Sequence, residues 1–285
     1  MSARTCDMCG KSTPEVRLSR EHVFSQALRD TVDDHGDHVV TEAVGRKIAE
    51  FEYSQCTRPV NLMDVTARTV CERCNNGWMS KLESEANTTL RRLIDGTDSL
   101  TANDVNVVRL WCAKTAAVIE MAAARGDDDA PVAADDRAEI QNGVVPAGWI
   151  VTLTRLDRSW RHHIQRSHAP LPLNRIVGGE ARIERYHFTV IGIGCMLATV
   201  IGGPPGSDAC ADVTLLTARA LGRRVRAIAP LLPGRATRLG TWHAPDQATI
   251  QRLPLFVTAL LTQENKFSHK NESTPTISKQ HPLNR

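Results

Sequence analysis

The spacing of apolar residues predicts two helices in the first half of the chain. Between residues 75 and 95, apolar side chains recur at helical intervals, and Gly96 follows as a stop signal. The residues of this face are Trp78, Leu82, Ala86, Leu90 and Leu93. A second helix is predicted to run from Thr101 to Gly126, with Asp104 placed to form a capping box at its start.

The second half of the chain changes to a strand-like pattern. Apolar and β-branched runs at residues 149–156, 185–193 and 195–201 predict buried strands. Residues 127–136 (DDDAPVAADD) form an acidic, alanine-rich break, and the polar residues 263–285 are predicted to be a disordered tail. Helices followed by strands predict an α+β fold class.

Composition limits the classes of partner. The 285 residues suffice for one large or two modest domains. A net charge of +3 permits a polyanionic partner without demanding one. Aromatic residues make up only 4%, which argues against base stacking as the main binding device.

The chain shows no membrane or export signal. It opens MSARTCDMCGKSTPEVR, without an apolar signal-peptide segment, and no run of about 18 apolar residues follows. We therefore expect a cytoplasmic protein with no membrane partner. Cysteines stay reduced in that compartment, where CxxC pairs more often bind metal than form disulfides.

Two CxxC pairs predict a metal site. Cys6, Cys9, Cys71 and Cys74 offer four thiolates, the closed tetrahedral shell of a structural zinc site. The remaining cysteines are expected to be ordinary small core or surface residues. They are Cys56, Cys112, Cys195 and Cys210.

A second group of residues suggests chemistry. Residues 18–24 read LSREHVF, in which Glu21 offers oxygen to a hard cation and His22 could take a proton from water. Asn75 follows the last paired cysteine, where its amide oxygen could add a second ligand to Mg²⁺. Alternatively, Glu21 and His22 form a surface pair, and Asn75 and Asn76 cap a helix.

The order of CDMCG, SREHVFS and VCERCNNGWMSKLE resembles the HNH (His-Me finger, ββα-metal) endonucleases in their zinc-stapled form. The resemblance covers roughly residues 6–90. It implies that His22 activates water for attack on a phosphodiester, leaving 5′-phosphate and 3′-hydroxyl ends. It also implies that Glu21 and Asn75 hold a catalytic Mg²⁺ or other divalent ion, and that the four paired cysteines hold zinc.

The chain departs from the family pattern at three points. Glu21 stands where the family usually has Asp, which adds one methylene. The nearest upstream asparagine is Asn61, ten residues before Cys71, and it takes the base-orienting role unless a backbone carbonyl does. The long insertion between the two strands contains His35 and His38, which are expected to be solvated loop histidines.

The resemblance implies a division of the chain. Residues 1–95 would be an HNH-like ββα-metal nuclease module, 96–126 a connecting helix and 137–262 an α+β accessory domain. The expected partner is nucleic acid, DNA rather than RNA, with a protein partner for targeting as in prokaryotic defence. The alternatives are a non-catalytic zinc-stapled module that binds nucleic acid or protein, and a redox or zinc-sensing switch.

Two basic segments could follow a phosphate backbone: RSWRHHIQRSH at 158–168 and GRRVR at 222–226. A solvated strand edge explains the first equally well. No GxxxxGK[ST] phosphate loop and no GxSxG nucleophile motif occur in the sequence.

Overall fold

The structure is a computed structural model of the chain. It describes residues 4–32, 39–47, 50–57, 62–67, 69–123, 132–161, 163–177, 180–203, 229–243, 250 and 253. Helices and strands are both present, which confirms the α+β class. Among these residues, every helix is too short or too polar to cross a membrane.

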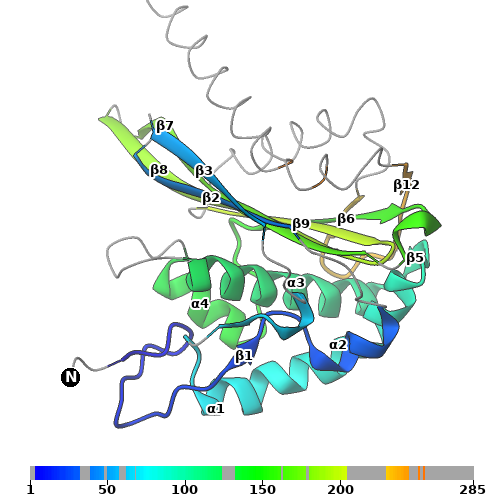
Figure 1. Ribbon diagram of the computed structural model, residues 1–285, viewed down its shortest axis with the longest axis horizontal. Helices are drawn as coiled ribbons and strands as arrows, with labels where there is room; N and C mark the ends of the chain where they lie inside the picture. The colour runs from blue at the N-terminus through cyan, green and yellow to red at the C-terminus, as the bar shows by residue number, and fades with distance from the viewer. Residues whose placement is uncertain are drawn as a thin grey trace, which may run out of the picture.

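One eight-stranded sheet forms a layer of the fold (Figure 1). Its strands are β2 (Val39–Lys47), β3 (Glu50–Thr57), β6 (Ile150–Leu156), β7 (Ile164–Val177), β8 (Glu180–Ile193), β9 (Met196–Gly202), β10 (Ala229–Pro230) and β12 (Thr241–Trp242). The order is β10-β6-β9-β8-β7-β2-β3, with β12 beside β6. The pairs β2–β7 and β12–β6 are parallel, and the others are antiparallel.

The strands predicted from apolar runs are confirmed. The runs at 149–156, 185–193 and 195–201 coincide with β6, the second half of β8 and β9. A turn at Gly194 joins β8 to β9, and the φ of +54° at this glycine is a backbone conformation that other residues rarely adopt. The glycine-interrupted apolar stretch therefore folds back on itself as a buried hairpin.

The long insertion between His22 and Cys71 contains two strands that the sequence pattern did not predict. It supplies β2 and β3, and β2 joins the sheet through the pairs Thr41–Ser167 and Glu42–His168. The polar residues 54–57 belong to β3, which extends through Thr57. The polar composition of β3 suits its position at one end of the described strand order.

Strand β7 was also missed. It contains Pro170 and Pro172, and proline within a run normally argues against a strand. The pairs of β7 with β8 nevertheless continue from Ile164 to Val177. Among the described residues, β7 pairs with β2 only at Ser167 and His168, which precede the prolines. A proline has no backbone N–H to donate to a second neighbouring strand.

The helices lie against one face of this sheet (Figure 1). They are α1 (Glu72–Cys74), α2 (Ser80–Ile94), α3 (Ala102–Ala123) and α4 (Ala134–Gln141), with 3₁₀ turns η1 (Gln26–Thr31), η2 (Leu62–Asp64) and η5 (Arg158–Trp160). Helix α3 contacts β6, β8 and β9 on one side and α2 on the other. It is therefore the middle layer of the described fold, which explains why residues 111–121 are all buried.

Two charged residues interrupt the apolar surface of α3. Lys114 faces α2, where its Nζ lies 2.8 Å from Glu83 Oε1. Glu120 faces the sheet, where Thr189 Oγ1 donates a 2.6 Å hydrogen bond to its Oε1 and His168 Nδ1 lies 3.4 Å from its Oε2. Burial alone would raise the pKa of Glu120, but His168 and Thr189 lower it below its ordinary value.

The glycine stop after α2 and the capping box at the start of α3 are both confirmed. Helix α2 ends at Gly96, whose φ is +94°, and Thr97 N donates to Arg92 O over 2.9 Å in a Schellman pattern. At the start of α3, Thr101 N donates to Asp104 Oδ2 over 2.9 Å, and Asp104 N donates to Thr101 Oγ1 over 3.2 Å. This is a capping box with Asp in the usual Glu position. Gly126, the predicted stop of α3, lies outside the described residues.

Two short sheets and a common core complete the fold. Strand β1 (Glu21–His22) pairs with β4 (Thr66–Ala67), and β5 (Ser99–Leu100) pairs with β11 (Thr237–Arg238). A single cluster of buried apolar side chains extends from Cys6 to Leu239. Apolar burial therefore connects the cysteine-rich region with the sheet. The domain division expected from the sequence stays a prediction.

Asp104 is expected to stabilise the fold above acid pH. Burial would raise its pKa, but hydrogen bonds from Thr89 and Thr101 and the contact with Arg92 lower it from 3.8 to about 2. A depressed folded-state pKa gives stability that is present above pH 3.8 and lost as the pH falls toward 2. Asp104→Asn should therefore lower the free energy of unfolding at pH 7 by about 2 kcal/mol.

Urea denaturation at pH 7 and across the acid range measures this effect. Asp95→Asn is a suitable control, because Asp95 is 55% exposed in a surface pair with Arg161 and should contribute little. Equal losses in the two variants would contradict a special role for Asp104.

Candidate metal centres and polar pocket

The four paired cysteines come together in space. Their sulfur atoms all lie within 4.8 Å of one another, and Cys6, Cys71 and Cys74 are buried. The Sγ atoms of Cys9 and Cys71 are 3.8 Å apart. Zinc with four sulfur ligands at about 2.3 Å separates neighbouring sulfurs by roughly 3.8 Å. The cluster could therefore hold a metal ion such as zinc, as the spacing predicted.

The surroundings of the cluster favour thiolate. The backbone N–H of Cys71 donates to Cys6 Sγ over 3.2 Å. A hydrogen bond from the Cys74 thiol lowers the pKa of Cys6 to about 4, against the opposing effect of burial. The same contact raises the pKa of Cys74. The lowered pKa of Cys6 favours its thiolate form, the form in which cysteine binds a metal ion.

An antiparallel ladder connects the cysteine cluster to Glu21 and His22. Glu72 N donates to Arg17 O, and Ser19 N donates to Val70 O, each over 2.8 Å. The ladder continues into β1, where Glu21 pairs with Ala67 and His22 with Thr66. The two short strands β1 and β4 therefore place Glu21 and His22 next to the segment that carries the second CxxC pair.

Asn75 is fixed to the same ladder. Its backbone N–H donates to Cys71 O over 2.9 Å, and its side-chain Nδ2 donates to Ser19 Oγ over 3.1 Å. Ser19 Oγ in turn donates to Val70 O over 3.0 Å. The amide nitrogen of Asn75 is thereby engaged, which leaves the amide oxygen for another partner.

The helix that carries Asn75 is not regular at this point. Residues Asn75–Met79 form a π-helical turn, η3, between α1 and α2. Gly77 has φ −97° and ψ −111°, outside the helical range, so the axis bends there. Such turns recur at functional sites because they change the direction of side chains on the helix.

Glu21, His22 and Asn75 line one cavity of about 340 Å³. The other lining residues are Ser25, Gln26, Ala27, Ser80, Glu83, Ser84 and Asn87. The cavity lies between the β1–η1 segment and α2, and all of its lining side chains except Ala27 are polar. Oxygen donors of this kind suit Mg²⁺ or Mn²⁺ better than soft metals.

A buried lysine lies behind the cavity. Lys114 Nζ is 3.6 Å from Glu21 Oε1 and 2.8 Å from Glu83 Oε1, and the Lys114 side chain is 0% exposed. Burial raises the pKa of Glu21, and the nearby Glu83 adds to that effect, while Lys114 opposes it. Lys114 thus partly offsets the effect of burial on the pKa of Glu21.

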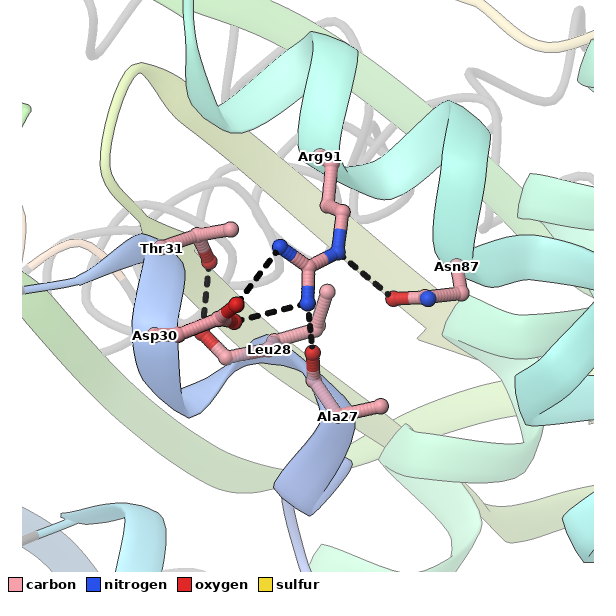
Figure 2. A network of polar contacts seen from close by, with 6 residues as sticks. All are labelled: Ala27, Leu28, Asp30, Thr31, Asn87 and Arg91. Atoms are coloured by element: carbon pink, nitrogen blue, oxygen red, sulfur yellow. Dashed lines mark hydrogen bonds and ion pairs between the residues drawn. The ribbon is translucent and has the colours of Figure 1, made fainter.

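Arg91 connects two segments that line the cavity, and Figure 2 shows its contacts. From α2 it donates to both carboxylate oxygens of Asp30, over 3.1 and 2.7 Å, and also to the carbonyl of Ala27. Its Nε donates to Asn87 Oδ1 over 3.2 Å. The planar guanidinium therefore joins η1 to α2, and two of its partners, Ala27 and Asn87, line the cavity.

The remaining residues singled out in the sequence are either outside the described part of the chain or differ in burial. Asn61, His35, His38, Cys210 and the basic segment 222–226 lie outside the described residues. In the segment 158–168, Arg158 and Arg161 are exposed, but Arg166 and His168 are buried. The second half of that segment therefore does not face a phosphate backbone. Cys112 and Cys195 are buried core residues, as expected.

Sequence reasoning missed Glu83 and Lys114. Glu83 stands in the polar run SKLESE, which looks like an exposed helix face. Lys114 had a signal, because it is a single positive charge within LWCAKTAAVIE, an otherwise apolar helical run. A charge in such a run requires a buried partner.

Comparisons with protein-family models, curated proteins and solved structures gave no match to this chain. The cavity and the cysteine cluster are therefore interpreted from their own geometry and chemistry.

Removing one sulfur should release the metal from the cysteine cluster. Cys9 is the most exposed of the four sulfur residues, so Cys9→Ala should disturb packing least. We expect about one zinc per chain in the wild type and a large loss in this variant, with a lower thermal midpoint because metal binding stabilises the folded state. Atomic absorption and thermal melts measure both quantities.

Cys112→Ala is the matched control, because it also removes a buried thiol but lies outside the cluster. Unchanged zinc content in Cys9→Ala would show that the cluster does not bind the metal.

Proposed function

We propose that this chain is a divalent-cation-dependent nuclease that hydrolyses phosphodiester bonds, most favourably in DNA. The observation that carries the proposal is that Glu21, His22 and Asn75 line one polar cavity beside the four-cysteine cluster. These are the three residues that the resemblance to HNH endonucleases assigns to the base and the cation.

In this proposal each residue has a separate role. His22 is partly exposed at the cavity, so its imidazole nitrogen accepts a proton from a water molecule there. Glu21 and Asn75 contribute oxygen atoms that hold the cation. When bound, the divalent cation supplies positive charge that stabilises the transition state and the leaving oxygen.

The reaction balances without a further reactant. The water oxygen forms a bond to phosphorus, and the bond from phosphorus to the 3′ oxygen breaks. One proton of the water passes to His22, and the leaving oxygen ends as a 3′-hydroxyl after it gains a proton. The products are 5′-phosphate and 3′-hydroxyl ends.

The cysteine cluster has a supporting role in this reading. It joins the segment before Glu21 to the helix start that carries Asn75, so metal binding there fixes both sides of the cavity. A ligand set that includes four sulfurs leaves no open position for a reacting water, which favours a structural role for that metal.

His22→Ala is expected to reduce cleavage of plasmid DNA in Mg²⁺ or Mn²⁺ by at least about 100-fold, the usual contribution of a general base. Zinc content and thermal midpoint should stay close to wild type, because His22 is not in the cysteine cluster. Gel analysis of nicked and linear plasmid measures the rate.

His243→Ala is the matched control, since His243 is 64% exposed and lies outside the cavity. A wild-type protein that cleaves neither DNA nor RNA with Mg²⁺, Mn²⁺ or Ni²⁺ would contradict the nuclease proposal. A zinc-loaded chain that binds DNA without cleaving it would instead favour a non-catalytic module.

A further inference from the structure

Lys114 is an unusual residue for its position. It lies on α3, within the uninterrupted buried stretch 111–121, and its side chain is 0% exposed. An aliphatic residue would complete this helix surface without removing a charge from water. Burying an ammonium group is unfavourable unless partners compensate it, so the position points to a role for the charge.

The partners of Lys114 are two carboxylates of the cavity. Its Nζ lies 2.8 Å from Glu83 Oε1 and 3.6 Å from Glu21 Oε1. Because one ammonium contacts both groups, two carboxylates from different elements, β1 and α2, are held close together. Lys114 contacts the Oε1 atom of each, and a carboxylate has a second oxygen that can bind a cation.

The charges of this group suit a phosphate complex. Two carboxylates and one ammonium leave a single negative charge at the wall of the cavity. A divalent cation would change that to a single positive charge, which the negative charge of one phosphodiester would balance. Without Lys114, a divalent cation would only neutralise the two carboxylates. The site would then keep no net positive charge to attract the substrate phosphate.

We propose, on the basis of the nuclease function above, that Glu83 is a third cation-binding residue. Lys114 is the positioning residue that orients Glu83 and Glu21 toward the cavity. Glu83 lines the cavity together with Glu21 and Asn75, and its side chain is 21% exposed, which gives it access to a bound cation. The site would then have three protein residues, and water and phosphate oxygens complete the shell.

The test is direct binding of Mn²⁺ to the full zinc-loaded chain, measured by electron paramagnetic resonance and calorimetry. Glu83→Gln keeps the size of the side chain and an oxygen for Lys114 but removes the charge. We expect its Kd for Mn²⁺ to rise at least about tenfold, the usual cost of a lost supporting group. The Mn²⁺ concentration for half-maximal cleavage should rise by a similar factor, while the rate at saturating Mn²⁺ changes less.

Glu85→Gln is the matched control. Glu85 is on the same helix, 52% exposed and paired with Lys81 at the surface. This substitution should leave the Kd for Mn²⁺ unchanged.

Lys114→Met should weaken Mn²⁺ binding about 10–100-fold, as expected for a residue that orients ligands. Because that variant removes the ammonium beside the buried Glu21 and the partly exposed Glu83, it could fail to fold, and Glu83→Gln therefore decides the proposal.

The outcomes separate this proposal from the nuclease proposal. Wild-type Mn²⁺ affinity in Glu83→Gln overturns the role of Glu83, even where His22→Ala abolishes cleavage and the nuclease function stands. Weakened Mn²⁺ binding in Glu83→Gln, in a chain that cleaves no nucleic acid, supports the cation site and overturns the nuclease function. A wild-type chain that binds no Mn²⁺ beyond the zinc site overturns both.

Discussion

The meeting of the two CxxC pairs is the constraint on which the rest of the site depends. The pairs are separated by more than sixty residues of sequence, yet their sulfurs lie within 4.8 Å of one another. The segment from Arg17 to Val23 runs directly from the first pair, and Asn75 directly follows the second. Backbone bonds between these segments then set the register of Glu21 and His22 against the helix start. A small change at the sulfurs would therefore change the shape of the cavity.

Helix α3 adds a second constraint from the opposite side. It fills the layer between the sheet and α2, and each of its two buried charges faces a different neighbour. Lys114 reaches the carboxylates of the cavity, while Glu120 accepts a hydrogen bond from Thr189 of the sheet. Because both groups need fixed partners, the helix has little freedom to rotate or slide. The cavity and the sheet are thus connected through one rigid element.

The sequence predicted those parts of the structure that depend on local signals. Periodic apolar residues located α2 and α3, the Thr101–Asp104 pair located a helix start, and the spacing of cysteines located the metal cluster. It did not predict β2, β3 or β7, because β2 and β3 mix polar with apolar residues and β7 contains two prolines, so these strands lack the usual pattern. Their pairing depends on contacts between distant segments.

The residues of the candidate site also fall into two groups, those that the sequence predicted and those that only the structure showed. Glu21, His22 and Asn75 stood out because of short motifs, and they line one cavity. Glu83 and Lys114 belong to ordinary-looking helical runs, and only the packing of α2 against α3 brings them to Glu21. Residues outside a motif therefore become visible as members of a site only when the third dimension is known.

The position of β2 and β3 has a consequence for the unity of the molecule. These strands lie in the chain between His22 and Cys71, but β2 pairs in the sheet with β7, where Thr41 lies opposite Ser167 and Glu42 opposite His168. The two halves of the cavity are therefore separated by a segment that belongs to the sheet. A fragment ending at residue 95 would keep β3 beside β2 but would lack β7 on the other side of β2 and Lys114 beside Glu21. The pocket therefore includes contacts with residues beyond position 95, namely Lys114 at the cavity and β7 beside β2.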